Sequence, residues 1–143
     1  MIVVDSNVIA YCWVNGPLTG LAQRVRVKDP DWHVPILWRS EMRSILTGYL
    51  REGSLTAPQV ARIMDAAERT LAGSEHLVSS ASVFEIVGKS RLSAYDCEFV
   101  SLASALAAPL VTADRAVLKA FPEQALTMET FLNAQGSARR RGQ

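Results

Sequence analysis

The sequence predicts a single α/β domain in which helices cover both faces of a parallel sheet. Short apolar runs alternate along the chain with longer helical segments. The first run, Ile2-Val3-Val4, is made of β-branched residues, which is typical of a strand buried on both faces. Carboxylates follow two of the runs, at Asp5 and Asp114. Ligands of open parallel sheets bind beyond the carboxyl ends of the strands, where strand order reverses, so both acids are candidate site residues.

The elements can be placed in order from apolar runs, caps and breakers. Strands are expected at residues 2–5, 32–36, 75–78, 109–112 and 125–128. Helices are expected at residues 6–14, 18–27, 37–51, 58–71, 79–89, 93–107, 114–121 and 129–134. Asn15-Gly16-Pro17 ends the first helix, and Thr56-Ala57-Pro58 starts the fourth with a proline near its first turn.

Length and composition indicate one domain with a core of its own. The chain has 143 residues, of which 49% are hydrophobic and 20% are charged. We expect this domain at residues 1–135 and a disordered basic tail at residues 136–143. The longest apolar run, residues 105–111, is too short to cross a membrane, and no signal peptide is expected. Cys12 and Cys97 lack redox or metal spacing, which favours a cytoplasmic protein.

The charge of the chain by itself predicts no partner. The 15 basic and 14 acidic side chains give a net charge of +1. Without Arg139, Arg140 and Arg141 the count becomes 12 basic against 14 acidic, or −2. A protein that binds nucleic acid by charge alone has a stronger basic excess. Any contact with nucleic acid must therefore come from a local site, a metal ion or a second subunit.

Two further acids stand near helix starts, Glu41 and Asp96. Each of the four acids has an ordinary structural explanation. Asp5 and Asp114 suit helix N-caps, Asp96 completes a capping motif with Ser93, and Glu41 suits an exposed helix position. Considered together, however, carboxylates that converge on one edge repel one another unless a cation lies between them. Oxygen-only ligands favour Mg²⁺ or Mn²⁺, which points to phosphoryl chemistry.

Other chemistries lack the residues that they need. His33 and His76 have no partner at metal-binding spacing, and we interpret both as structural. The sequence therefore indicates no histidine pair for metal-free RNA cleavage. No glycine-rich phosphate loop occurs. Asn7 stands where aspartyl-phosphate phosphatases usually carry a second aspartate, and nucleophilic Ser or Cys catalysis lacks a base.

The chain resembles the PIN-domain ribonucleases, specifically the VapC-type toxins of type II toxin–antitoxin systems. The segments that carry the resemblance follow in order: Ile2-Val3-Val4-Asp5-Ser6-Asn7-Val8-Ile9, Glu41 in its helix, Arg51-Glu52-Gly53-Ser54-Leu55, Tyr95-Asp96-Cys97-Glu98-Phe99-Val100-Ser101-Leu102-Ala103 and Pro109-Leu110-Val111-Thr112-Ala113-Asp114-Arg115. They span nearly the whole chain. The resemblance implies a PIN-like fold with a five-stranded parallel sheet in the order 3-2-1-4-5. It also implies an endoribonuclease that depends on Mg²⁺ or Mn²⁺. Such a protein is expected to bind a cognate VapB-type antitoxin and to form a homodimer.

The resemblance also implies roles for particular residues. Its acidic quartet corresponds to Asp5, Glu41, Asp96 and Asp114. Asp5 and Asp96 would be direct metal ligands, Asp114 would hold a second metal position or a water, and Glu41 would position or deprotonate the attacking water. The supporting polar residues are Ser6, Asn7 and Thr112, and Arg115 is the candidate phosphate contact.

The chain departs from the family at Val117, where many members carry another acid. The number of bound metal ions, one or two, is therefore left open. Glu98 is expected to point to another helix face than Asp96. Two alternative functions remain: a catalytically inactive PIN-like interaction module, and a DNA-directed nuclease on the same fold. The apolar residues of the third and fourth helices favour ordinary core packing over a partner surface.

Overall fold

The computed structural model describes the backbone of residues 1–141 and the side chains of residues 1–134. Its five strands are β1 (Ile2–Val4), β2 (Trp32–Pro35), β3 (Glu75–His76), β4 (Leu110–Val111) and β5 (Ala125–Leu126). Its helices are α1 (Ser6–Trp13), α2 (Thr19–Lys28), α3 (Trp38–Glu52), α4 (Ala57–Leu71), α5 (Ser80–Val87), α6 (Ala94–Leu106), α7 (Arg115–Ala120) and α8 (Met128–Arg141). The basic tail expected at residues 136–143 has its side chains outside the described part and stays a prediction.

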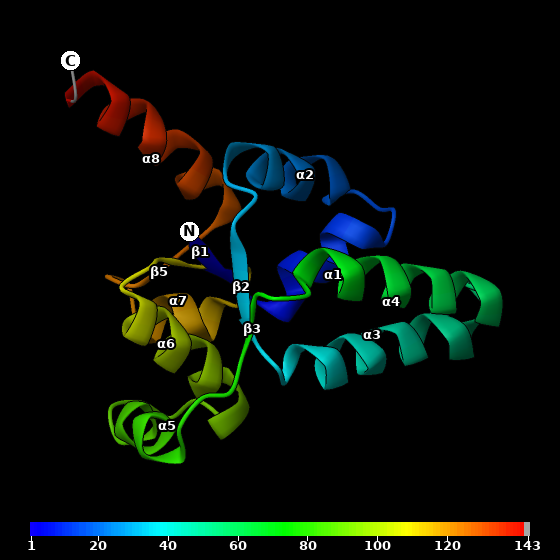
Figure 1. Cartoon of the computed structure of the whole chain (residues 1–143), viewed down its shortest axis with the longest axis horizontal. Coiled ribbons are helices and arrows are strands. Elements are labelled where there is room, and N and C mark those ends of the chain that lie inside the picture. The colour runs from blue at the N-terminus through cyan, green and yellow to red at the C-terminus, as the bar shows by residue number, and fades with distance from the viewer. Residues whose placement is uncertain (142–143) are drawn as a thin grey trace.

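The strands form one all-parallel sheet in the order β3-β2-β1-β4-β5, which confirms the predicted fold class. The β1 side chains are almost completely buried, as the β-branched run predicts. In Figure 1, α1, α3 and α4 lie on one side of the sheet, while α5, α6 and α7 lie on the other. Strand order reverses between β1 and β4, so the carboxyl ends of these two strands form the expected place for a ligand.

The register of β1 and β4 brings distant residues of the chain side by side. Val3 is paired with Leu110 and Val4 with Val111. The next residues, Asp5 and Thr112, therefore emerge together from the carboxyl edge. The backbone N–H of Asp5 donates to the Val111 carbonyl oxygen at 3.0 Å, which extends the ladder by one more hydrogen bond.

The third strand is shorter than the sequence predicts. A strand was expected at residues 75–78, but β3 includes only Glu75 and His76. The side chain of Leu77 is 88% exposed, so the chain leaves the sheet at this residue. β3 pairs with β2 alone in the described sheet, and β4 and β5 are likewise two residues shorter than expected.

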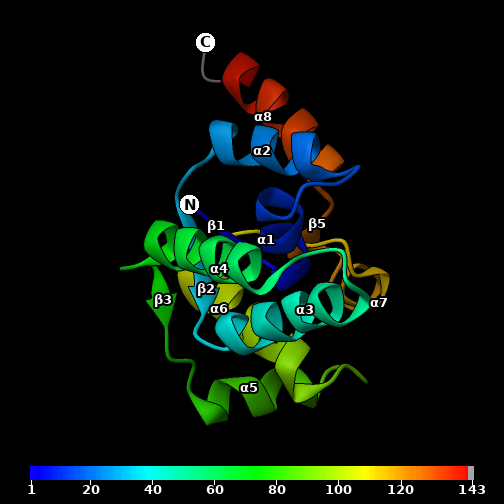
Figure 2. The same cartoon turned by 90° about the vertical axis from the view of Figure 1, so that its right-hand side faces the viewer.

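Helices α3 and α4 form a hairpin that projects from the sheet in Figure 1 and lies in front, facing the viewer, in Figure 2. Gly53, with a φ of 84°, ends α3 in the left-handed conformation that glycine adopts without strain. Thr56 and Gln59 form a reciprocal capping box at the start of α4. Leu46 of α3 is fully buried in the core, whereas Leu50 near the tip is exposed. Ordinary core packing therefore accounts for the base of the hairpin, as expected, and its tip keeps apolar surface.

Helices α2 and α8 lie together at the opposite end of the molecule from α5 (Figure 1). The ammonium group of Lys28 donates to the carbonyl oxygens of Phe131 and Leu132 and lies over the Phe131 ring. These contacts fasten the start of α8 to the end of α2. No helix in the part of the chain that the structure describes is long and apolar enough to cross a membrane.

Candidate functional site

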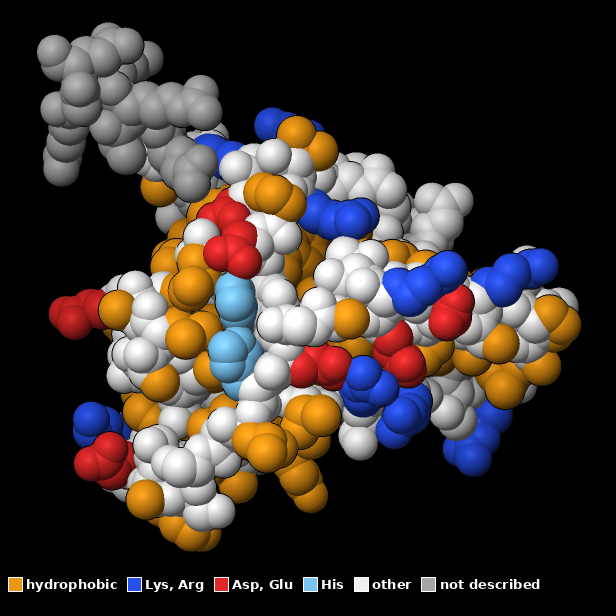
Figure 3. Space-filling model, in the orientation of Figure 1, with side chains coloured by type: hydrophobic (Ala, Val, Ile, Leu, Met, Phe, Trp, Pro, Cys, Tyr) orange, Lys and Arg blue, Asp and Glu red, His pale blue; other side chains and the backbone are white. Residues whose placement is uncertain are grey.

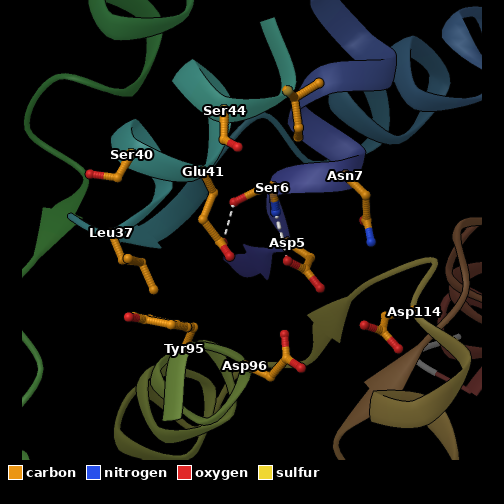
Figure 4. A pocket seen from close by; sticks show the side chains of 11 residues that line it. Asp5, Ser6, Asn7, Leu37, Ser40, Glu41, Ser44, Tyr95, Asp96 and Asp114 are labelled. Carbon is orange, nitrogen blue, oxygen red and sulfur yellow. Dashed lines mark hydrogen bonds between the residues drawn. The ribbon is translucent and has the colours of Figure 1, made fainter. Parts of the chain in front are cut away.

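A cleft of about 640 Å³ opens at the carboxyl edge of the sheet, between α3 and α6. All four acids of the predicted quartet line it. The lining residues are Asp5, Ser6, Asn7, Leu37, Ser40, Glu41, Ser44, Ile45, Tyr95, Asp96 and Asp114. None of them is basic. The carboxylates of Asp5, Asp96 and Asp114 point into the same space, and Glu41 reaches toward Asp5 from α3 (Figure 4).

Asp5 is the most deeply placed of the four acids, with only 7% of the residue exposed. Its Oδ1 accepts a hydrogen bond from the Ser6 backbone N–H at 2.7 Å, and its Oδ2 accepts one from the Thr112 hydroxyl at 2.7 Å. The Thr112 oxygen in turn accepts a hydrogen bond from the Asp114 backbone N–H at 3.0 Å. Thr112 therefore fixes the Asp5 carboxylate and the start of the Asp114 turn relative to each other.

Polar residues of the first helical turn connect the other sides of the site. The hydroxyl of Ser6 donates to Glu41 Oε1 at 2.8 Å, which ties α1 to α3 (Figure 4). The Asn7 side-chain oxygen accepts a hydrogen bond from the Ala113 backbone N–H at 3.3 Å. Ser6 and Asn7 therefore hold a carboxylate and the loop after β4 in place.

The capping explanation holds for two of the acids as well. Asp5 is the N-cap of α1, and Asp114 caps α7 by accepting hydrogen bonds from the Ala116 and Val117 backbone N–H groups at 2.8 and 3.3 Å. For α6 the cap is Ser93, whose hydroxyl oxygen accepts a hydrogen bond from the Asp96 backbone N–H at 3.1 Å. Asp5 and Asp114 thus cap helices and line the cleft at once, so the two explanations do not exclude each other.

Burial and neighbouring carboxylates raise the pKa values of Asp5 and Asp96. Burial raises the pKa of Asp5 most strongly, repulsion from Asp96 and Asp114 raises it further, and the hydrogen bonds from Thr112 and Ser6 oppose both. Burial raises the pKa of Asp96, and so does Asp114. The ionised forms of these carboxylates are therefore destabilised in the cleft, and a bound cation would stabilise them.

The pKa of Glu41 is raised for similar reasons. Burial is the largest cause, and repulsion by Asp5, Asp96 and Glu98 adds to it, against the hydrogen bond from Ser6. Glu98 does not line the cleft, as its helix position predicts, but it is close enough to affect Glu41. A carboxylate whose pKa is moved toward neutrality is a better proton acceptor at physiological pH than an ordinary surface glutamate.

The side chains that line the cleft are of the types that bind a hard divalent cation. Their positions in this structure, however, do not enclose one. Every polar lining side chain offers oxygen, or in Asn7 an amide, and neither histidine nor cysteine takes part. No group of three or more His, Cys, Asp or Glu side chains among the described residues is drawn close enough to enclose an ion. Asp96 and Asp114 are half-buried, and Asp114 Oδ1 is engaged by the backbone N–H groups of α7.

Positive charge lies outside the cleft. Arg115, the expected phosphate contact, is exposed at the start of α7 and does not line the cleft. Arg39 is held in a different network, because its Nε and Nη2 donate to Glu75 at 2.6 and 2.7 Å. Val117 is buried in the core, so the position where related proteins carry another acid contributes nothing to this site.

Sequence reasoning missed several residues that line the cleft. Leu37, Ser44 and Ile45 line the cleft together with Glu41. The other three residues follow Leu37 by four, seven and eight positions, which is the spacing of one helix face and could have been recognised in the sequence. Tyr95 also lines the cleft and is 62% exposed.

The spacing of the two histidines along the chain gave no sign that they lie together. His33 and His76 are in direct contact, because parallel pairing of β2 and β3 brings together residues 43 positions apart. Their ring nitrogens are only 2.8 Å apart, so no phosphate fits between them, and Asp31 beside them would repel an anion. The pair is therefore unsuited to metal-free RNA cleavage.

The raised pKa values lead to a pH-dependence of stability that can be measured. A carboxyl group with a raised pKa in the folded state stabilises the protein below its unfolded pKa and loses this contribution as pH rises through the folded value. In EDTA, Asp96→Asn should therefore melt at a higher temperature than the wild type at pH 7 to 8. This difference should shrink as pH falls toward 3.8, the ordinary pKa of aspartate. Comparing the two proteins cancels other groups, such as His76, whose pKa is lowered. A difference independent of pH would contradict the stated repulsion.

The fold and the cleft together define a class: a parallel α/β protein with carboxylates gathered where strand order reverses. The chain belongs to the PIN-domain family, whose sequence model matches residues 2–123. PIN domains are generally metal-dependent nucleases.

Comparison with solved structures agrees with this assignment at the level of the fold. The chain is similar to the crystal structure of PAE2754 from Pyrobaculum aerophilum, with 17% identity and a TM-score of 0.74, over 95% of this chain and 96% of that one. It is also similar to FitAcB from Neisseria gonorrhoeae, with 15% identity and a TM-score of 0.71, over 90% of this chain and 99% of that one. A search of curated protein sequences finds no match.

Proposed function

We propose that this protein is a metal-dependent endoribonuclease of the VapC type, the toxin of a toxin–antitoxin pair. The observation that carries the proposal is the cleft of a PIN-domain chain that four carboxylates line without a basic residue among them. Such a cleft repels a phosphodiester unless a cation is bound. The resemblance to VapC-type toxins supports RNA as the substrate.

In this proposal Asp5, Asp96 and Asp114 hold Mg²⁺ or Mn²⁺. The ion supplies positive charge next to the phosphodiester and Lewis acidity at its oxygens. Asp5 is the fixed ligand, because the Ser6 N–H and the Thr112 hydroxyl hold its carboxylate from behind. Asp96 of α6 and Asp114 at the start of α7 would be the other two ligands.

Glu41 is the residue that accepts a proton from the attacking water. Its raised pKa suits it to this task, and the hydrogen bond from Ser6 orients one of its oxygens. Arg115 contacts a phosphate of the bound strand from the exposed start of α7. Exposed Tyr95 offers an aromatic face beside the acids on which an unpaired base can stack, which favours single-stranded or looped RNA.

The proposed partners are a cognate VapB-type antitoxin and a second copy of the chain. Exposed apolar side chains at Leu77 and at Phe84 of α5 supply surface for one of these contacts. The proposed place of action is the cytoplasm, consistent with two buried cysteines that form no disulfide.

The decisive experiment compares RNA cleavage by the full chain, purified away from any partner, with and without a divalent ion. We expect cleavage of single-stranded RNA with Mg²⁺ or Mn²⁺, none in EDTA, and recovery when Mn²⁺ is restored in excess. Single-stranded DNA of the same sequence is the matched substrate. Cleavage that persists in EDTA would overturn the mechanism, preference for DNA would favour a DNA-directed nuclease, and no cleavage of either would favour an interaction module.

A further inference from the structure

The contact between His33 and His76 is the most specific arrangement of metal-binding side chains outside the acidic cleft. His33 Nδ1 lies 2.8 Å from His76 Nε2. Because Pro35 is paired with His76 in the sheet, His33 lies two residues earlier on the same face of β2 and meets His76 diagonally. Figure 3 shows the two histidines as one pale blue strip on the surface, with acidic side chains above it.

A carboxylate behind the pair determines which nitrogen of His33 carries its proton. His33 Nε2 lies 2.8 Å from Asp31 Oδ1. An ionised carboxylate only accepts, so Nε2 of His33 carries a proton, and in the neutral ring Nδ1 then presents a lone pair toward His76. Metal-binding histidines in proteins are held in this way, with the second nitrogen donating to a carboxylate that fixes the tautomer and the ring.

We propose that His33 and His76 form a binding site for a borderline transition-metal ion such as Zn²⁺, Ni²⁺ or Cu²⁺, separate from the acidic cleft. Two metal–nitrogen bonds of about 2.0–2.1 Å at a tetrahedral angle place the nitrogens about 3.3 Å apart. The rings therefore separate by about half an ångström on binding. His76, whose neutral ring carries its proton on Nε2, changes to the tautomer with the proton on Nδ1, and Nε2 then binds the ion. Rotation of His76 is feasible, because it is half-buried on a two-residue strand at the edge of the sheet.

The chemistry of the pair selects the ion. Imidazole nitrogen favours Zn²⁺, Ni²⁺ and Cu²⁺, whereas Mg²⁺ requires oxygen ligands. No third His, Cys, Asp or Glu among the described residues completes a cage, so water fills the remaining positions. Asp31 places a negative charge next to His33, whereas Asp29 is already paired with the Met1 ammonium group at 2.8 Å. A bound ion joins β2 to the edge strand β3, so its expected effect is to stabilise the sheet. This proposal does not depend on the nuclease assignment.

The test uses the full chain without a polyhistidine tag, in excess Mg²⁺ so that oxygen ligands are already engaged. Zn²⁺ should raise the melting temperature of the wild type and of Asp96→Asn equally. His76→Gln should abolish this rise, although its amide can still donate to His33. With one equivalent of Cu²⁺, electron paramagnetic resonance should show coupling to two imidazole nitrogens in the wild type. One of these couplings should be absent from His76→Gln.

Two further variants separate the site from a simple hydrogen bond. His33→Gln removes the other ligand and should also abolish the Zn²⁺ effect. Asp31→Asn leaves both ligands and should weaken Zn²⁺ binding about 10- to 100-fold, as is typical for a carboxylate behind a metal-binding histidine. No Zn²⁺ effect on the wild type would overturn the proposal and leave the pair a structural hydrogen bond. A Zn²⁺ effect that survives in both glutamine variants, or disappears in Asp96→Asn, would overturn it by placing the ion elsewhere.

Discussion

RNA cleavage by Asp96→Asn should be more than about a hundredfold slower than by the wild type, with the fold unchanged. Substitutions behind metal ligands already cost 10- to 100-fold, and a direct ligand should cost more. Asp96 is half-buried at the rim and does not provide the cap of α6, so asparagine disturbs neither the core nor the helix start. Initial cleavage rates at saturating Mn²⁺ and circular dichroism spectra measure the two halves of this prediction.

Glu98→Gln is the matched control, because it removes a carboxylate from the same helix two residues away. Glu98 does not line the cleft, so the rate at neutral pH should stay close to that of the wild type. Its charge does raise the pKa of Glu41, so this variant should shift the acidic limb of the pH–rate profile to lower pH. If Asp96→Asn cleaves as fast as Glu98→Gln, Asp96 is not a metal ligand.

The fold could be predicted in detail because its central strands carry strong local signals. β1 is a β-branched run buried on both faces, and an acid, a hydroxyl residue and an asparagine follow it at a helix start. The pairing of β1 with β4 was predictable from the resemblance, and with it the neighbourhood of Asp5 and Asp114. The length of β3 was not predictable, because the apolar residues of the segment, Leu77 and Val78, lie outside the strand and the polar residues Glu75 and His76 are the ones that pair with β2.

The acids of the cleft were predictable one by one, whereas their interactions were not. Nothing in the local sequence indicates that the Ser6 hydroxyl reaches Glu41, since the two lie 35 residues apart. The same limit applies to His33 and His76. Each sits in an unremarkable local pattern, and the contact exists only because of the register between β2 and β3. Pairwise contacts across parallel strands depend on register, and a shift by one residue would turn the side chain to the other face.

The capping role of Asp5 and Asp114 changes what their substitution can be expected to do. Asparagine is as good an N-cap as aspartate, so Asp→Asn keeps the caps of α1 and α7 while it removes the charge. Alanine would remove both and would confuse a lost ligand with a lost cap, at a cost of about 1 kcal/mol for each cap. The asparagine substitutions therefore isolate the metal site from the fold.

Mg²⁺ should raise the melting temperature of the wild type, and the combined Asp5→Asn, Asp96→Asn and Asp114→Asn variant should show no rise. An ion that binds only the folded state at a hundred times its dissociation constant stabilises that state by about 2.7 kcal/mol. For a domain of this size, this corresponds to a shift of several degrees. Mg²⁺ is the appropriate probe because imidazole is a poor ligand for it, so His33 and His76 do not contribute.

The metal-free triple variant should melt no lower than the wild type in EDTA, because it loses the mutual repulsion and the burial penalty that raise the pKa values of Asp5 and Asp96. Glu41→Gln should keep most of the Mg²⁺ shift while losing cleavage, since the proposed role of Glu41 concerns the water and not the ion. A wild-type melting temperature that does not respond to millimolar Mg²⁺ would contradict the metal site. A full shift in the triple variant would place the ion away from these three carboxylates, and the repulsion among them would then have no cation to relieve it.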